Sequence, residues 1–179
     1  MFIDLMRNRR SIRKFKDKEV EQEKIDILIE AMLRSPSSRS LNPWHFVVVN
    51  EPNVLAGLAK AKPHGGTFIK DAPLAIVICA DPDKCDVWIE DCSIAAIIVH
   101  IAAVDLGLGS CWVQIRLRDH GPHLSAEEYC KKIIGLPDHM VVEAVVAVGY
   151  PGEEKKGRPY SSLPFDRVHY NCHGRYNSV

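Results

Sequence analysis

The sequence predicts one domain of mixed α-helices and β-strands, without the strict strand–helix–strand rhythm of a parallel α/β sheet. Two observations support this prediction. Four short apolar stretches read as strands, and they are separated by segments with helical periodicity or turn residues. Residues 93–104 are apolar on every helical face except at Ser93 and His100, which is typical of a helix buried in the centre of a fold.

The segment 88–108 contains this central helix and organises the rest of the prediction. Its alanines let neighbouring backbones approach closely, and the acidic residues Glu90, Asp91 and Asp105 leave an apolar run too short to cross a bilayer. A helix that is apolar all round must be covered all round. Either the chain covers this helix alone or a second copy covers part of it. Because a chain of this size has few other elements to do so, a homodimer is favoured.

Composition and charge narrow the class of protein. The chain has 179 residues, 46% of them hydrophobic and 26% charged, as expected for one soluble globular domain spanning 1–179. The 23 basic and 23 acidic residues balance, so no overall field attracts nucleic acid or a membrane. Asp4 and Arg7 interrupt the amino terminus, which argues against a signal peptide. Six dispersed cysteines without a C-x-x-C pair indicate reduced thiols and a cytoplasmic location.

The remaining elements follow in order. Apolar spacing predicts helices over 2–8, 21–33 and 52–61, and a helix capped by Ser125 and Glu128 that runs to Ile134. Strands are expected over 46–49, 74–79, 111–115 and 141–148, a glycine stop at Gly107 and a turn at 64–66. The polar, proline-marked tail 152–179 carries scattered aromatic residues, so we expect it to lie over another surface, such as a partner subunit.

A basic segment at 7–18 carries seven cations and a single acid, the densest positive patch of the chain. Most such runs are solvated faces. Here Ser11, Ile12 and Phe15 interrupt the charges, so the segment is expected to pack and to present only some of its cations. Arginine forks beside a hydroxyl suit a phosphate or a polar heteroaromatic edge.

Common catalytic motifs are absent from the sequence. There is no G-x-S-x-G, P-loop or H-E-x-x-H, and the G-L-G at 107–109 follows a helix rather than a strand, which excludes a Rossmann site. The histidines at 120 and 123 read as ordinary loop residues, and the tail group His169, Cys172 and His173 lacks a fourth metal ligand. Difficult chemistry would therefore belong to a bound cofactor.

Several motifs together resemble the FMN-dependent nitroreductase family, in the family's order, from residue 2 to about residue 170. They are R-R-S-I-R at 9–13, S-P-S-S at 35–38, N-P-W-H-F at 42–46, L-G-L-G-S-C-W at 106–112, G-Y-P at 149–151 and R-P at 158–159. The resemblance implies an α+β fold with a mainly antiparallel sheet between helices. It also implies an intertwined homodimer with a long central interface helix and FMN at each subunit interface.

The resemblance also implies an activity and a set of site residues. Hydride would pass from NADH or NADPH to flavin N5 and on to a nitroaromatic, a quinone or a similar small acceptor, without a catalytic side chain. Residues from the amino-terminal segment, the partner's loop, a strand end and the tail would hold FMN: Arg9, Arg10, Ser11 and Arg13; Pro36, Ser37 and Ser38 of the partner; Trp112, Val113 and Gln114; and Lys156 and Arg158. In the family, a polar residue from the loop before the second strand often contacts the flavin ring, and Gly65 or Gly66 occupies that position here.

Two departures from the family's pattern concern the substrate. Better-known members often carry an acidic residue where Gln114 stands. The segment between Gln114 and Val141 is also short, where larger members insert helices that cover the active site. We therefore expect an open site, with residues 115–123 as a partial lid. A non-catalytic flavin or small-molecule binding protein of the same fold is the alternative. A nucleic-acid or phospholipid binder acting through 7–18 fits the charges but lacks an aromatic platform.

Overall fold

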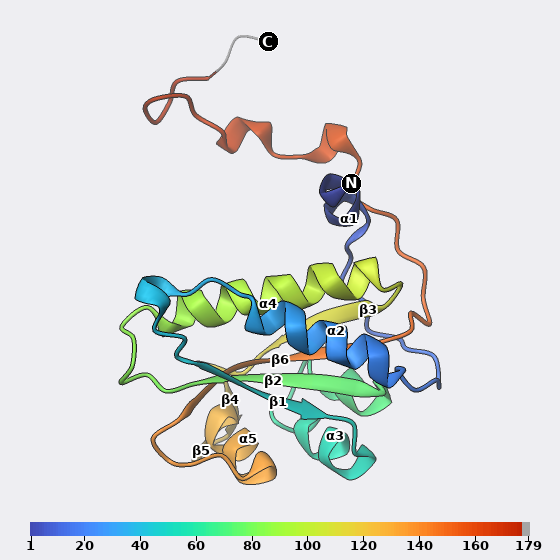
Figure 1. Ribbon diagram of the computed structural model, residues 1–179, viewed down its shortest axis with the longest axis vertical. Coiled ribbons are helices and arrows are strands. Elements are labelled where there is room, and N and C mark those ends of the chain that lie inside the picture. Colours follow the sequence, from blue (N-terminus) through green and yellow to red (C-terminus); the bar gives the residue numbers. More distant parts are fainter. Residues whose placement is uncertain (177–179) are drawn as a thin grey trace.

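A four-stranded antiparallel sheet forms the centre of the chain, whose computed structural model describes residues 1–176. The strands lie in the order β1–β2–β6–β3, with β1 at Trp44–Val49, β2 at Leu74–Ala80, β6 at Val141–Gly149 and β3 at Gly109–Gln114 (Figure 1). Every neighbouring pair is antiparallel, which confirms the expected sheet.

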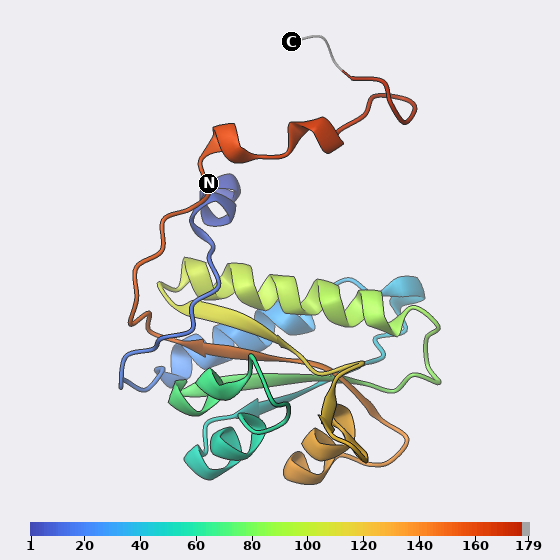
Figure 2. The ribbon, with the colours of Figure 1, turned by 180° about the vertical axis from the view of Figure 1, so that it is seen from behind.

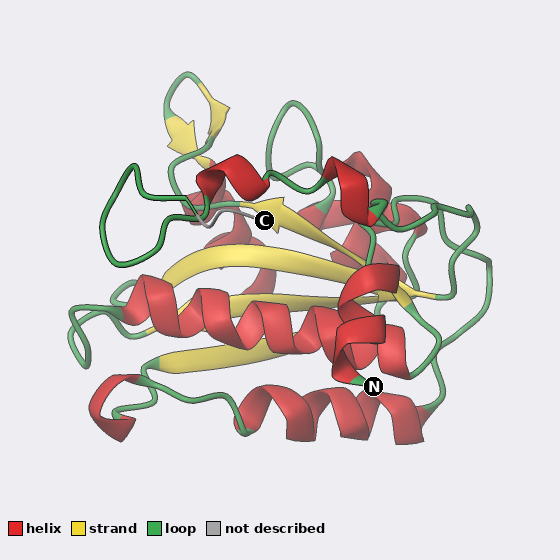
Figure 3. Cartoon of the chain, turned by 90° about the horizontal axis from the view of Figure 1, so that it is seen from above, coloured by secondary structure: helices red, strands yellow, loops and turns green. Residues whose placement is uncertain are grey.

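Helices cover both faces of the sheet, which explains why its two central strands, β2 and β6, are apolar except at Glu143. Helix α2 (Gln22–Leu33) and helix α4 (Trp88–Asp105) pack side by side on one face (Figure 3). Helix α3 (Pro52–Leu58) and helix α5 (Ala126–Ile134) cover the other face (Figure 2). Every residue of β2 is buried, because side chains on both faces meet a helix.

The central helix α4 is present as predicted, but this chain does not cover it on every side. Its sheet-facing residues Ala96 and Val99 are fully buried, whereas Ile94 and Ile97 are each 38% exposed. The alternative in which the chain alone wraps this helix is therefore wrong. Within residues 1–176, no helix is both long enough and apolar enough to span a bilayer.

The two ends of the chain leave the body together. Helix α1 (Phe2–Asn8) buries none of its residues, and the segment after Gly152 runs beside it and beyond (Figures 1 and 2). In the part of the tail that the structure describes, to residue 176, the helical elements are two short 3-10 turns, Tyr160–Ser162 and Phe165–Arg167. Apolar side chains on both ends are exposed, Phe2 at 65% and Phe165 at 50%.

Local details differ from the sequence expectations at several element ends, including those of β3, which spans Gly109–Gln114 rather than 111–115, and in one hairpin. The helix expected over 52–61 ends at Leu58, since Pro63 and the Gly65–Gly66 turn follow closely and cannot continue it. Strand β1 begins at Trp44 rather than at 46, because Trp44 pairs with Ala80. An unpredicted hairpin, β4 (Asp119–Gly121) with β5 (Leu124–Ser125), occupies part of the proposed lid.

The cap of α5 agrees with prediction. The backbone N–H of Glu128 donates to Ser125 Oγ at 3.1 Å, and the Ser125 N–H donates to Glu128 Oε2 at 3.0 Å. This reciprocal pair satisfies two N–H groups that the helix itself leaves free. Gly135 ends α5 in the left-handed conformation.

Candidate functional site

The basic segment is fixed to the edge strand β3. The backbone N–H of Ile12 donates to the carbonyl oxygen of Ser110 at 3.0 Å, and Ser11 forms a parallel bridge with the same residue. Ile12 is buried against Gly109, where an added Cβ would lie only 2.8 Å from the Ile12 side chain. The expectation that this segment packs is confirmed, and its apolar anchor leaves the neighbouring cations at the surface.

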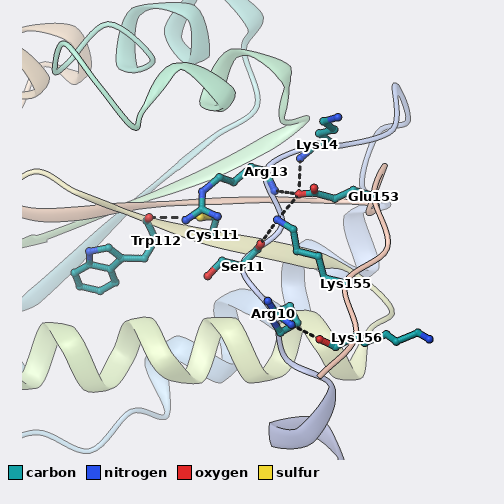
Figure 4. Close-up of polar contacts among 9 residues, drawn as sticks. All are labelled: Arg10, Ser11, Arg13, Lys14, Cys111, Trp112, Glu153, Lys155 and Lys156. Atoms are coloured by element: carbon teal, nitrogen blue, oxygen red, sulfur yellow. Dashed lines mark hydrogen bonds and ion pairs between the residues drawn. The ribbon is translucent and has the colours of Figure 1, made fainter. Parts of the chain in front are cut away.

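The tail clamps the same segment from the other side (Figure 4). Glu153 Oε1 accepts hydrogen bonds from the backbone N–H groups of Arg13 at 2.7 Å and Lys14 at 3.2 Å, and from Lys155 Nζ at 2.8 Å. Lys155 Nζ also donates to the carbonyl oxygen of Ser11 at 2.9 Å. Hydrogen bonds from Lys155 and the Arg13 N–H lower the pKa of Glu153 to about 2, so this carboxylate stays ionised.

A cleft of about 1080 Å³ lies between α1, the basic segment and the tail. None of the described residues that line it is acidic. Its polar lining includes two hydroxyl-bearing residues, Ser11 and Tyr160, and six cations: Arg7, Arg9, Arg10, Arg13, Lys155 and Arg158. Ile3, Met6 and Leu163 supply apolar wall. Asp4 pairs with Arg7 and Glu153 pairs with Lys155, so the other four guanidinium groups supply the positive charge that suits a multiply charged anion.

All four predicted amino-terminal residues line this cleft, but only one of the two adjacent tail lysines does. Arg10 donates to the carbonyl oxygen of Lys156, whose side chain points away from the cluster (Figure 4). Lys155, which sequence reasoning passed over, is the lysine that lines the cleft. In an extended segment successive side chains alternate in direction, so Glu153 and Lys155 share one side and Lys156 lies on the other.

The predicted residues of strand β3, Trp112, Val113 and Gln114, do not line the cleft; they follow Ser110, the residue that pairs with Ser11, along the same strand. The guanidinium of Arg13 points toward Cys111 (Figure 4) and lies 5.9 Å from the centre of the Phe68 ring. Burial raises the pKa of the Cys111 thiol and Arg13 offsets part of this rise, so the thiol is not activated. Trp112 Nε1 donates to Gln114 Oε1 at 3.0 Å on the α4 side of the sheet.

Val113 points to the opposite face, where Gly66 approaches it. A Cβ on Gly66 would lie 3.6 Å from Val113 Cγ1, so the 64–66 turn borders β3 at Val113. The hairpin β4–β5 is close by, since His120 Nδ1 lies 3.3 Å from the carbonyl oxygen of Ala61. The His120 ring stacks on Tyr129 at 4.0 Å between centroids, which supports its interpretation as an ordinary structural histidine.

Residues 36–38 lie elsewhere in the same chain. Ser38 contacts Asp91 near the start of α4, whereas Ser11 lies beside Ser110, whose Oγ is 2.7 Å from Nδ1 of His100. Asp91 and His100 are nine residues apart, or about 14 Å along a helix that rises ~1.5 Å per residue. One chain therefore does not bring the two predicted groups together.

His100 is a neutral group in this arrangement. Burial, with a smaller contribution from the nearby charge of Arg9, lowers the pKa of His100 to about 4. The neutral ring links α4 to β3 through the Ser110 hydroxyl. Among the described residues, no group of three or more His, Cys, Asp or Glu side chains could hold a metal ion.

Known proteins match nearly the whole chain. The model of the nitroreductase family matches residues 6–64 and 59–150. An FMN-dependent nitroreductase from Clostridium difficile R20291 superposes with a TM-score of 0.94 at 46% identity, over 95% of this chain and 99% of that one. A relative from Methanothermobacter thermautotrophicus, provisionally named NADH dehydrogenase/NAD(P)H nitroreductase, is 34% identical over 93% of this chain and 85% of its own length. The NADH dehydrogenase of Thermus thermophilus is 30% identical over 89% of this chain and 90% of its own length.

Proposed function

This chain belongs to the nitroreductase family, and from that premise we propose that it is an FMN-dependent enzyme that oxidises NADH or NADPH. We further propose that the electrons pass to a small organic acceptor, such as a nitroaromatic compound or a quinone. The observation that carries the proposal is the cleft beside β3, in which six cations and a serine hydroxyl meet without any carboxylate among the described lining residues.

The residues of the cleft fit FMN chemically. Its phosphate monoester is close to doubly charged at neutral pH and accepts several hydrogen bonds, which arginine forks donate in pairs. Arg9, Arg10 and Arg158 would hold the phosphate, and Ser11 would bond the ribityl chain. Of the two tail lysines, Lys155 is the candidate for the phosphate from its position in the cleft, whereas Lys156, the residue that the family resemblance implies, directs its side chain away.

The bound flavin would supply the two-electron carrier, so the protein's task is to bind and orient. Arg13 would face the polar edge of the ring system, and Trp112, Val113 and Gln114 would support its plane along the end of β3. A fixed cation beside that edge favours the redox form with more negative charge there. None of these roles needs a side chain that takes up or releases a proton.

We propose that the working unit is a homodimer with α4 at its interface. The apolar stripe on α4, made of Ile94, Ile97, Ile98 and Ile101, is at least partly exposed in the single chain. Pro36, Ser37 and Ser38 lie at the other end of α4 from the basic cleft, so they would serve the cleft of the partner subunit. Two copies related by a two-fold axis would complete both sites.

The extended ends of the chain support the same arrangement. Helix α1 and the tail from residue 152 carry exposed apolar side chains and cover little of their own body. We propose that 1–179 is a single domain whose tail lies over the partner subunit. All six cysteines are free thiols, which supports the proposed cytoplasmic location.

Anaerobic reduction of the purified protein tests the proposed function directly. The protein should be yellow, and NADH or NADPH should bleach its visible absorption, which an added quinone or nitroaromatic compound should then restore. A protein that is yellow but is not bleached by either donor would instead support the non-catalytic flavin-binding alternative. A protein that neither holds FMN after purification nor binds added FMN would contradict the proposal.

A further inference from the structure

Asp91 is a buried residue of α4 whose carboxylate accepts hydrogen bonds from residues outside its own helix. It lies in the first turn of α4 and is only 3% exposed. Its Oδ1 accepts a hydrogen bond from the backbone N–H of Ser38 at 2.9 Å, and its Oδ2 accepts one from Cys85 Sγ at 3.5 Å. No cation in the described chain forms an ion pair with it. Burying a carboxylate without a paired cation costs free energy, which hydrogen bonds to the carboxylate must offset.

The loop that Asp91 holds has a strained backbone. Arg39, Ser40 and Asn42 have φ angles of 53°, 55° and 47°, a left-handed conformation that side-chain-bearing residues seldom adopt. Ser37 Oγ accepts from the backbone N–H of Asn42 at 3.0 Å and donates to its side-chain oxygen at 2.6 Å. Such a conformation persists where surrounding contacts fix it, and strained segments gather at binding sites.

The same carboxylate borders the exposed face of α4. Ile94 follows Asp91 by three residues, less than one helical turn, and begins the apolar stripe. One end of the loop is closed by the bonds between Ser37 and Asn42, and the Ser38 N–H is tied to α4 by Asp91. The helix that would form the dimer interface therefore also fixes the position of residues 36–38.

We propose that Asp91 is a positioning residue that holds residues 36–38 in the conformation required at the flavin site of the partner subunit. The proposal rests on the proposed function, because it requires a shared FMN site. With the Ser38 N–H bound, the hydroxyls of Ser37 and Ser38 are held in place before the cofactor arrives. Without this bond, part of the binding free energy would be used to order the loop.

Three single variants compare the strength of FMN binding. Asp91→Ala removes both acceptors and should weaken FMN about tenfold, the effect of one charge-assisted hydrogen bond. Asp91→Asn keeps an oxygen for the Ser38 N–H and should bind FMN within about threefold of the wild type. Asp105→Ala removes an exposed carboxylate at the other end of α4 and should leave binding unchanged. Flavin fluorescence measures affinity, and light scattering confirms that each variant is dimeric.

A mixed dimer tests whether Asp91 acts on the partner's site. One chain carries Asp91→Ala and the other carries Arg10→Ala, which damages the basic cleft. If the loop serves the partner, one site combines both defects and the other has neither, so half of the sites should bind FMN with wild-type affinity. If both sites bind weakly, the proposal is overturned. A purely structural defect would also give no normal site.

The remaining outcomes are distinguishable. If the wild-type protein does not bind FMN, the proposed function itself is contradicted. Normal FMN binding by both the wild type and Asp91→Ala would leave the function intact and overturn only the role of Asp91. If the Asp91→Ala chain fails to fold even beside an Arg10→Ala partner, Asp91 is required for folding, and its assignment as a positioning residue is also overturned.

Discussion

Lys155 and Lys156 are adjacent in sequence, yet their ammonium groups lie on different sides of an extended segment. Lys155 Nζ reaches Ser11 and Glu153, whereas Lys156 contributes its carbonyl oxygen to Arg10 and directs its side chain away (Figure 4). At the scale of single residues, the geometry of the backbone thus decides which of two equal charges can act on a phosphate in the cleft.

This difference gives a prediction for the two lysines. Lys155→Gln should weaken FMN about tenfold and riboflavin much less, because only FMN carries the phosphate and a charge-assisted bond is worth about 1.5–3 kcal/mol. Lys156→Gln, the matched control, should change neither affinity more than about twofold. Titration of the apoprotein with both ligands measures this. Equal losses of FMN and riboflavin in Lys155→Gln would show that Lys155 acts by holding Ser11 in place.

Arg13 leads to a second prediction at this scale. Its guanidinium points along β3 toward Cys111, where the polar edge of the flavin would lie (Figure 4). Arg13→Gln keeps a donor but removes the charge, so the midpoint potential of bound FMN should fall by some tens of millivolts, since about 30 mV corresponds to 1.4 kcal/mol. Spectroelectrochemical titration measures the potential. An unchanged potential at full flavin loading would place Arg13 away from the ring.

The sequence allowed part of the site to be predicted at the residue scale. Arg9, Arg10, Ser11 and Arg13 are contiguous, so their shared location needs no tertiary information. Lys155 was missed because its role depends on the direction of alternate side chains in an irregular tail. From the sequence, Asp91 was interpreted only as a charge at the end of an apolar run. Its role could not be predicted, because its hydrogen bond to Ser38 joins positions 53 residues apart.

Among the elements, those with long patterns were predicted and short ones were missed. The helix α4 and the strands β2 and β6 follow directly from long apolar runs, which in β6 only Glu143 interrupts. The hairpin β4–β5 has strands of only three and two residues, too short for an alternating pattern to emerge. The uncovered face of α4 could not be located from sequence, because residues of every face of this helix are apolar.

The pairing of the tail with the basic segment predicts how stability depends on acid. The folded-state pKa of Glu153 is lowered to about 2 from an ordinary value of 4.5, so the unfolded chain binds a proton more readily. Its stabilising contribution is complete above about pH 4.5 and is lost as the pH falls toward 2. Glu153→Gln should flatten this part of the stability profile, measured as urea midpoints between pH 2.5 and 6.

The neighbouring residue supplies the control for this experiment. Glu154→Gln removes an exposed carboxylate from the same segment and should retain the wild-type slope below pH 4.5. If both variants keep that slope, the clamp between Glu153, Lys155 and the Arg13 N–H contributes little to acid stability. The tail would then be held by other bonds to the basic segment, such as the one from the Gly152 N–H to the carbonyl oxygen of Lys14 at 2.8 Å.

At the scale of the whole molecule, one chain leaves several apolar surfaces uncovered. Its sheet is covered on both faces, but the Ile94–Ile97 stripe, helix α1 and the tail leave apolar side chains in water. A homodimer would explain both observations: the partner would cover these surfaces, and its residues 36–38 would reach the basic cleft. The sequence indicated a second copy only through the all-round apolar helix, and it could not show which surfaces remain for that copy to cover.

Charge placed on the α4 stripe therefore tests the whole arrangement. Ile97→Glu should convert the dimer to a monomer, because an unpaired carboxylate would be buried in an apolar interface that we expect to exceed about 2,000 Å². FMN binding should fall with dimerisation, since residues 36–38 of the partner would be lost from each site. Ile27→Glu is the matched control, because Ile27 is also exposed but lies among polar neighbours on α2. Light scattering and flavin titration at several protein concentrations measure both effects together. A monomeric Ile97→Glu protein that binds FMN as tightly as the wild type would show that each chain holds the cofactor alone.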